Sequence, residues 1–340
     1  MGKTKIEWAD NSWGPLRAIV KADAAAIAAA KGYTSLVQIA AKMAGHVGPH
    51  CERVSDGCGK GDEGGCYSEA NNSRCLPSNG TGLPFDRRAR DLVDPFVDGK
   101  ILAQPLGWRT AKRVFVCSQT DLFGEWVTDE MIDHVFAVMA LCERHQFQCL
   151  TKRPERAVKY FRNPADLRDR LASLLVDPRF LDNWGTRKAW LGNPSRAGVA
   201  EGISKGWRSP LGAHIWIGVS AENQKTWDER TRQLEQIPAA IRFVSLEPQL
   251  AYVDVGPVLN QGNIRWVVQG GESGPSARPF DIAWARNTIA QCKAAGVACF
   301  VKQLGAKAFD ASEGMLGYSG KGGDWECWPA DLKVREFPDA

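Results

Sequence analysis

From about residue 113 onward, the sequence alternates short apolar runs typical of β-strands with amphipathic stretches typical of helices. Alternation of this kind implies parallel strands joined by right-handed helical crossovers. Six predicted strands and a possible seventh near the amino terminus favour an α/β fold, a full or partial parallel (β/α) barrel, over a doubly wound sheet. The predicted strands cover residues 5–8, 113–117, 147–150, 214–219, 241–246, 264–268 and 297–301.

Local signals indicate where the helices between these strands begin and end. Thr128 is suited to cap a helix, because its hydroxyl can accept a backbone N–H. Pro154 is favoured in the first turn of the next helix, and Gly296 is suited to end a helix over residues 282–295. No GxGxxG motif or P-loop follows the early strands, so a nucleotide-binding Rossmann unit has no support.

Charge and hydrophobicity narrow the class of protein further. The chain of 340 residues carries 43 Lys and Arg against 39 Asp and Glu, and 44% of its residues are hydrophobic, as in globular proteins. Its short basic runs are unlike a polybasic tail, so we expect any contact with nucleic acid to be local. No apolar stretch reaches the roughly 18 residues of a membrane span, and the start does not resemble a signal peptide. We therefore expect a cytoplasmic protein with no membrane partner.

Three segments depart from the alternation of strands and helices. Residues 17–45 are rich in alanine with helical spacing, and residues 163–212 are polar and punctuated by Gly and Pro. We interpret both as insertions on the barrel, where such segments serve as lids, substrate-binding elements or added packing layers. Residues 46–75 form a Cys-rich loop. The whole chain, 1–340, is thus expected to be a single barrel domain with two insertions.

Cys51, Cys58 and Cys66 follow the spacing C-x6-C-x7-C in a Gly-rich stretch that is poor in apolar residues. A hydrophobic core would not gather three thiols there, whereas a Gly-rich backbone can wrap closely around a metal group. Iron–sulfur clusters normally take four Cys ligands, so a three-Cys loop would leave one iron available for a non-protein ligand. The loop therefore indicates an iron–sulfur cluster as one candidate.

Two alternatives remain open on spacing alone. Three Cys and one further ligand are an ordinary structural zinc set, which His46, His50 or Cys75 could complete. The three thiols could also bind no metal. Five other cysteines fall on predicted strands or helices and are assigned to core packing, because a buried free Cys behaves as a small hydrophobe. They are Cys117, Cys142, Cys149, Cys292 and Cys299.

A series of short motifs runs through the chain in a fixed order. The motifs are TKIEW at 4–8, the three-Cys loop ending in CY at 66–67, SxxDLF at 118–123, LTKRP at 150–154, GVSxENQ at 218–224, LEP at 246–248, GGESG at 270–274, ARP at 277–279 and KQ at 302–303. In this order they resemble a phage-associated three-cysteine family of radical-SAM-like proteins. One departure is that the family's loop is closer to C-x6-C-x2-C, as if five residues were inserted between Cys58 and Cys66.

The resemblance implies a barrel of radical-SAM type in which Cys51, Cys58 and Cys66 hold a four-iron cluster. S-adenosylmethionine would bind the fourth iron, and its reductive cleavage would yield a deoxyadenosyl radical that abstracts hydrogen from an unreactive carbon. An electron donor such as flavodoxin would be needed. For a phage-encoded protein, the compartment would be the cytoplasm of the host cell.

Most of the motifs fall just after a predicted strand, where the active sites of parallel barrels are built. A ring of carboxylates, amides and cations suits a zwitterion such as S-adenosylmethionine. The catalytic candidates are Glu247, Lys302 and Lys152. The cofactor-binding candidates are Ser118, Asp121, Gly270, Gly271 and Glu272. The substrate-binding candidates are Trp126, as a stacking platform for a base, with Glu222 and Asn223.

The resemblance further implies modification of a nucleobase in phage DNA. Within the family, the chain is similar to enzymes that convert 5-N-glycinyl thymidine to its C-linked isomer during thymidine hypermodification. The substrate would be DNA or a modified thymidine nucleotide. The alternative is a non-catalytic protein on the same scaffold, either a zinc-stabilised DNA-binding module or a partner protein that has lost the cluster.

Overall fold

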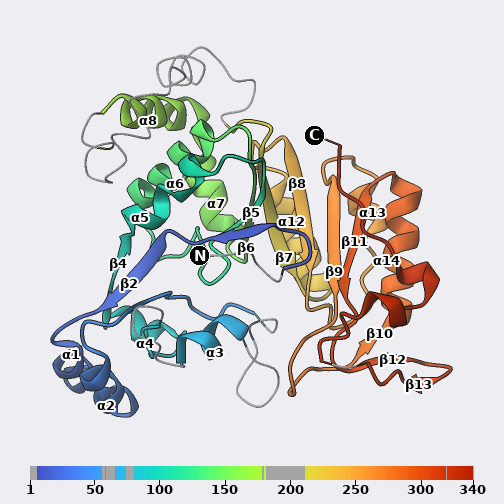
Figure 1. Ribbon diagram of the computed structural model, residues 1–340, viewed down its shortest axis with the longest axis horizontal. Coiled ribbons are helices and arrows are strands. Elements are labelled where there is room, and N and C mark those ends of the chain that lie inside the picture. The colour runs from blue at the N-terminus through green and yellow to red at the C-terminus, as the bar shows by residue number, and fades with distance from the viewer. Residues whose placement is uncertain are drawn as a thin grey trace.

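The computed structural model describes residues 6–55, 58, 66–73, 80–177, 180, 211–318 and 320–339. At its centre, a parallel sheet of seven strands curls into a half-barrel, in the order β1-β5-β6-β7-β8-β9-β11 (Figure 1). The strands are β1 (Asn11–Trp13), β5 (Arg113–Val116), β6 (Gln146–Thr151), β7 (Ile215–Ala221), β8 (Ile241–Leu246), β9 (Trp266–Gly270) and β11 (Ala298–Gln303). The partial parallel barrel predicted from the alternation is thus confirmed.

Helices follow the strands and cover the outer face of the sheet. They are α6 (Asp129–Leu141), α7 (Pro154–Phe161), α12 (Gln224–Leu234), α13 (Gly256–Leu259) and α14 (Ile282–Ala295). The predicted helix ends are confirmed, because Thr128 accepts the N–H of Met131 and Pro154 opens α7. Gly296 ends α14 with a φ of 65°, which only glycine adopts readily.

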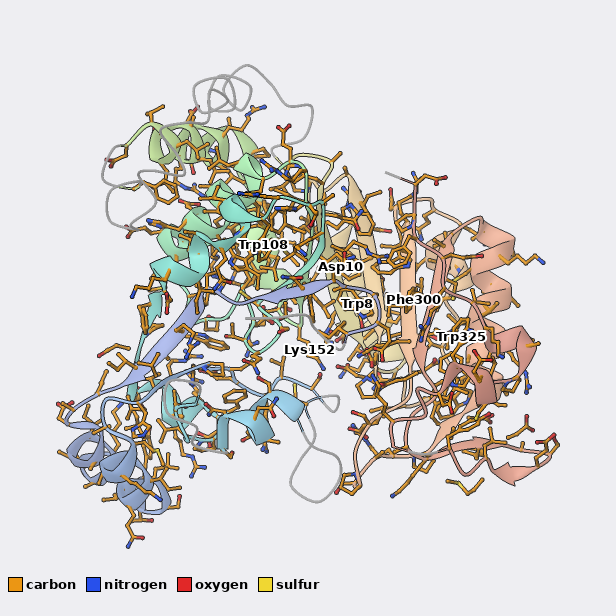
Figure 2. All side chains as sticks on the ribbon, viewed as in Figure 1. Trp8, Asp10, Trp108, Lys152, Phe300 and Trp325 are labelled. Carbon is orange, nitrogen blue, oxygen red and sulfur yellow. The ribbon has the colours of Figure 1, made fainter. Side chains whose placement is uncertain are left out.

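The predicted first strand over 5–8 is wrong for its described residues, 6–8. The edge strand is instead β1, where Asn11 lies beside Val114 of β5 in parallel register. Trp8 lies on the concave side of the sheet, 2% exposed, with its ring 5.8 Å from that of Trp266 (Figure 2). Its apolar character therefore reflects packing across the barrel and not strand pairing.

We define the aromatic floor as Trp8, Trp216, Phe243, Trp266 and Phe300, which are all at most 2% exposed. The ring of Trp266 lies at the centre, within 6.0 Å of each of the other four rings. These edge-on and tilted arrangements are the favoured ones for aromatic pairs. The floor fills the barrel interior toward the amino-terminal ends of the strands.

A small unit precedes the second barrel strand. Three antiparallel strands pair in the order β3-β2-β4, and short helices pack beside them. The elements are β2 (Leu16–Val20), α1 (Ala24–Ala30), α2 (Thr34–Met43), β3 (Val47–Gly48), α3 (Tyr67–Ser73), α4 (Arg87–Arg90), β4 (Val93–Val97), α5 (Gly99–Leu102) and η2 (Gln104–Gly107). The expected helices of segment 17–45 are therefore present, but the segment begins inside a strand, with Ala18 and Val20 buried.

The other expected insertion, 163–212, is described only in part. Its helix α8 (Pro164–Val176) packs on α6 through Leu167, Leu171 and Leu175. Residues 178–179 and 181–210 lie outside the described part of the chain.

The carboxyl-terminal part adds β10 (Phe280–Asp281), β12 (Ala308–Asp310), β13 (Gly314–Met315), η3 (Trp325–Cys327) and η4 (Ala330–Leu332). The five cysteines assigned to core packing are all buried, as predicted. Within the described ranges, no helix has the length and apolarity needed to cross a membrane.

Candidate functional site

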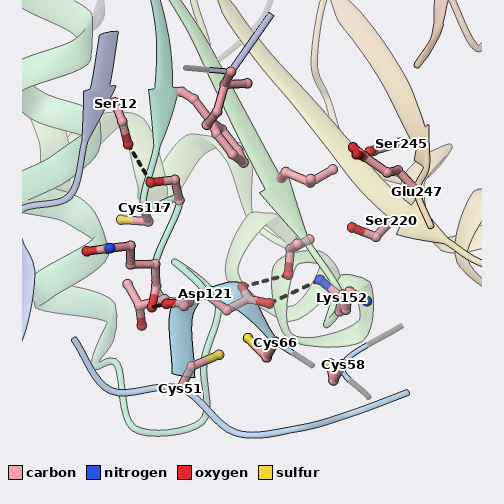
Figure 3. Close-up of a pocket in the computed structure, with 18 of the residues that line it drawn as sticks. Ser12, Cys51, Cys58, Cys66, Cys117, Asp121, Lys152, Ser220, Ser245 and Glu247 are labelled. Carbon is pink, nitrogen blue, oxygen red and sulfur yellow. Dashed lines mark hydrogen bonds between the residues drawn. The ribbon is translucent and has the colours of Figure 1, made fainter. Parts of the chain in front are cut away.

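A cavity of about 790 Å³ opens at the carboxyl ends of the barrel strands (Figure 3). Side chains from the sheet and from the segment around the three cysteines line it together. The carboxyl end of a parallel barrel is where active sites of this architecture are found, and the volume is in the range of small-molecule sites. This cavity is the candidate site.

The strands bring polar groups to the cavity through their two-residue repeat. Along β8, Phe243 belongs to the aromatic floor, and Ser245, two residues on, lines the cavity. Ser220 of β7 is the register partner of Ser245, so the two hydroxyl-bearing residues lie side by side. On β11, Lys302 also lies two residues beyond Phe300 of the floor, at a shift in register between Val301 and Gln303. The same face of each strand is thus apolar at one end and polar at the other.

Several ion pairs border the cavity, among them Glu247–Lys302 and Glu272–Arg278. The Lys302 Nζ lies 2.6 Å from the Glu247 Oε1, and both side chains are largely buried. Arg278 binds Glu272 through two hydrogen bonds of 2.8 Å, which is the strong bidentate geometry. Gly271 packs so tightly against β11 that a Cβ there would lie 2.6 Å from the carbonyl oxygen of Leu304. The GGE motif therefore places Glu272 at the cavity wall, close against the segment that follows β11.

Asp121 ties the ends of β5 and β6 together. Its carboxylate, in a side chain only 7% exposed, accepts the Thr151 hydroxyl at 2.7 Å and the Lys152 N–H at 3.0 Å. The Arg153 guanidinium adds an ion pair at 3.2 Å. Ser118, on the same loop as Asp121, makes a short hydrogen bond with Ser12 of β1 (Figure 3). These contacts hold the loop after β5 rigidly at the cavity.

Cys51, Cys58 and Cys66 line this same cavity. Figure 3 shows the sulfur atoms of Cys51 and Cys66 near one another below Asp121. Burial raises the pKa of the Cys51 and Cys66 thiols. Among the described residues, no three His, Cys, Asp or Glu side chains are grouped so that they could hold a metal ion. The three thiols thus share a cavity without forming such a group.

The residues considered as a fourth zinc ligand are placed as follows. The His50 ring packs edge-on against Trp126 at 5.0 Å, and its Nε2 lies 3.7 Å from the Glu52 Oε1. His46 directs its Nδ1 to the carbonyl oxygen of Met43, at 3.1 Å. Cys75 lies outside the described residues.

Four of the predicted site residues are not in the cavity lining. Asn223 caps α12 by accepting the Thr226 N–H, and Trp126 stacks under Arg153, 4.7 Å from the ring centre. Gly270 packs against Gln303 of β11. Glu222 is fully buried in ion pairs with Lys152 and Arg230.

Other cavity residues were not singled out from the sequence. Ser245 could have been found from the two-residue repeat of β8, counted from Phe243. Ser12 is missed because the first strand is predicted at residues 5–8, whereas it lies at β1. Lys321 carries no local signal, and it forms an ion pair at the cavity with Glu7 of the TKIEW motif, from which almost the whole chain separates it.

Comparison with protein families matches residues 43–329 to the family described as "Protein of unknown function (DUF5131)". Neither curated proteins nor solved structures give a match. The matched range contains the three cysteines and every strand of the half-barrel except β1. Because the match covers most of the chain, the protein belongs to the DUF5131 family.

Proposed function

We propose that this protein is a radical SAM enzyme that modifies a nucleobase in phage DNA. The observation that carries the proposal is that Cys51, Cys58 and Cys66 line one cavity together with the Glu247–Lys302 ion pair. Three thiols at the polar end of a parallel half-barrel suit a 4Fe–4S cluster that keeps one iron open. The phage-associated three-cysteine family that the motifs resemble supplies the reaction class.

The donor set fits the proposed groups chemically. The three Cys would hold the cluster as thiolates, and the cavity has room for a small ligand beside it. When bound, the cluster and S-adenosylmethionine supply a one-electron route to hydrogen abstraction from an unactivated carbon. The amino and carboxylate groups of S-adenosylmethionine need opposite charges, which Glu272 with Arg278 and Glu247 with Lys302 offer.

The chain's own residues would then bind and orient the substrate and shield the cavity from water. The aromatic floor closes the barrel interior below the cavity, which keeps water from entering on that side. Lys302 and Glu247, 2.6 Å apart, hold opposite charges side by side at the cavity wall, where they can orient a charged ligand. Within this class we propose isomerisation of 5-N-glycinyl thymidine to its C-linked form, on DNA or on the nucleotide, with flavodoxin or a similar protein as electron donor.

The first test is the iron and acid-labile sulfide content of anaerobically reconstituted protein, with its visible spectrum. We expect roughly four of each per chain in the wild type and none in the Cys51/Cys58/Cys66→Ala variant. Cys327→Ala, at an exposed thiol outside the cavity, is the matched control and should keep the wild-type content. Zinc without iron in the wild type would instead support a structural zinc site at the three cysteines.

The substrate needs a separate assay. Reduced protein and S-adenosylmethionine are incubated with DNA or nucleotide carrying 5-N-glycinyl thymine, and both deoxyadenosine and the C-linked isomer are measured. Formation of both supports the proposal. Deoxyadenosine without the isomer would retain the radical chemistry and reject this substrate.

A further inference from the structure

We propose that Glu222 is a positioning residue which, acting through Ser55, holds Cys58 at the cavity. The inference rests on the proposed function in one respect, because it takes Cys58 to be a ligand of the cluster. Cys58 borders the stretch in which the spacing to Cys66 is five residues wider than in the resembling family.

The Glu222 carboxylate is the fixed point of this arrangement. It comes directly after β7 and is fully buried, with an exposed fraction of 0%. Lys152 lies 2.5 Å from its Oε1, and Arg230 lies 3.2 Å from its Oε2. Two cations on a buried carboxylate hold it in one orientation, since moving it would leave buried charges unpaired.

Ser55 connects the Glu222 carboxylate to Cys58. Its hydroxyl donates to the Glu222 Oε1 at 2.8 Å, and the Lys152 Nζ lies 3.4 Å from the same hydroxyl. Its carbonyl oxygen in turn accepts the N–H of Cys58 at 2.8 Å. Glu222, Ser55 and Cys58 are therefore connected by two hydrogen bonds, one from the end of β7 to the loop and one within the loop.

The other two cysteines are held from different strands. Beside Cys51, the carbonyl oxygen of Glu52 accepts a hydrogen bond of 2.8 Å from Arg153, which follows β6. Near Cys66, the Ser68 hydroxyl donates to the carbonyl oxygen of Gln119, on the loop after β5, at 2.8 Å. The contact from β7 through Ser55 thus serves Cys58 separately, and its loss should affect that cysteine selectively.

The test removes the bridging hydroxyl and leaves the buried charges in place. Metal-free, reduced Ser55→Ala protein is alkylated with iodoacetamide under anaerobic conditions, and mass spectrometry follows each thiol against exposed Cys327. A hydrogen bond to a charged group is lost, so we expect Cys58 to react about tenfold faster than in the wild type. Cys51 and Cys66 should change less than about twofold. After reconstitution, iron content should fall as well.

Two variants serve as controls. Ser55→Thr keeps the hydroxyl and should restore wild-type alkylation and iron content. Ser73→Ala removes a hydroxyl that bonds within α3, to the carbonyl oxygen of Glu69, and should change neither measurement.

The inference is overturned if Ser55→Ala leaves the Cys58 rate unchanged, or if all three thiols gain reactivity together, since the loop would then be released as a whole. These results are distinct from failure of the proposed function, which would appear as a wild type that binds no iron. In that case the alkylation rates still decide whether the Ser55 hydroxyl, which donates to Glu222, positions Cys58.

Discussion

The two ends of the half-barrel interior are built from the same strands and differ in almost every property. Toward the amino-terminal ends lies the aromatic floor, and toward the carboxyl ends lies the polar cavity. On β8 the change from Phe243 to Ser245 takes two residues, and on β11 the change from Phe300 to Lys302 takes two as well. One strand therefore contributes apolar packing at one end and polar groups at the other.

The two ends of the interior are subject to different physical constraints, namely packing volume at the floor and charge at the cavity. Rings in the floor contact each other closely, so their volume is tightly specified. Side chains at the cavity face a space, so their volume matters less than their charge and hydrogen bonding. Substitutions should accordingly affect the free energy of unfolding most at the floor.

The largest effect is expected for Trp266→Ala, at the centre of the floor. Removal of a fully buried indole should lower the free energy of unfolding by about 3–5 kcal/mol, through lost burial and the cavity left behind. Urea denaturation measures this value. Trp284→Ala, at a partly exposed tryptophan on α14, is the control and should cost less than about 2 kcal/mol. If both variants lowered the free energy of unfolding equally, the prediction that packing is most tightly specified in the aromatic floor would be wrong.

The second-largest effect is expected for Glu222→Gln. It should lower the free energy of unfolding by about 3 kcal/mol near neutral pH, because Lys152 and Arg230 lose their buried counter-charge. Burial raises the pKa of Glu222, but Lys152 and Arg230 outweigh it, and the pKa is lowered from 4.5. The stabilisation is therefore complete above pH 4.5 and lost as the pH falls below it. The difference between wild type and variant should shrink in acid.

Denaturation at several pH values tests the Glu222 prediction. Glu229→Gln, at an exposed position of α12, is the matched control and should show little effect at any pH. A difference between wild type and Glu222→Gln that grows in acid would contradict the assigned pairing.

Lys302→Met should lower the free energy of unfolding by about 2 kcal/mol, because the largely buried Glu247 carboxylate loses its counter-charge and faces only the cavity. Under the proposed function it should also weaken binding of S-adenosylmethionine about tenfold, since one charge that matches the zwitterion is gone. Calorimetric titration measures the binding, and Lys307→Met, at an exposed lysine, should leave it unchanged. Unaltered affinity in Lys302→Met would remove this lysine from the ligand site.

Ser245→Ala should have the smallest effect, within about 0.5 kcal/mol, because its hydroxyl faces the cavity and alanine preserves the strand. Thermal and urea denaturation both report it. The comparison is sharpened by Phe243→Ala, two residues earlier on the same strand face, which should cost several times more. A similar loss of unfolding free energy at both positions would contradict the proposed difference between the floor and the cavity.

Sequence reasoning found what repeats along the chain or has a local signature. The parallel strands, the caps at Thr128 and Gly296, and the strand-end positions of Glu247 and Lys302 all follow from periodicity or neighbouring residues. It failed where a residue of the right type serves another purpose. Asn223 fits a polar strand end, but it is used to cap α12.

Patterns in the sequence were sufficient to predict the class of fold and the end of the barrel at which polar groups would gather. Strand alternation and helix caps act between residues close in the chain, so their signals survive without a structure. Only the tertiary structure decided that Trp8 belongs to the floor, that Lys321 meets Glu7, and that Glu222 reaches Ser55. Those contacts join segments far apart in the chain, and they depend on how the sheet curls, which no short-range pattern specifies.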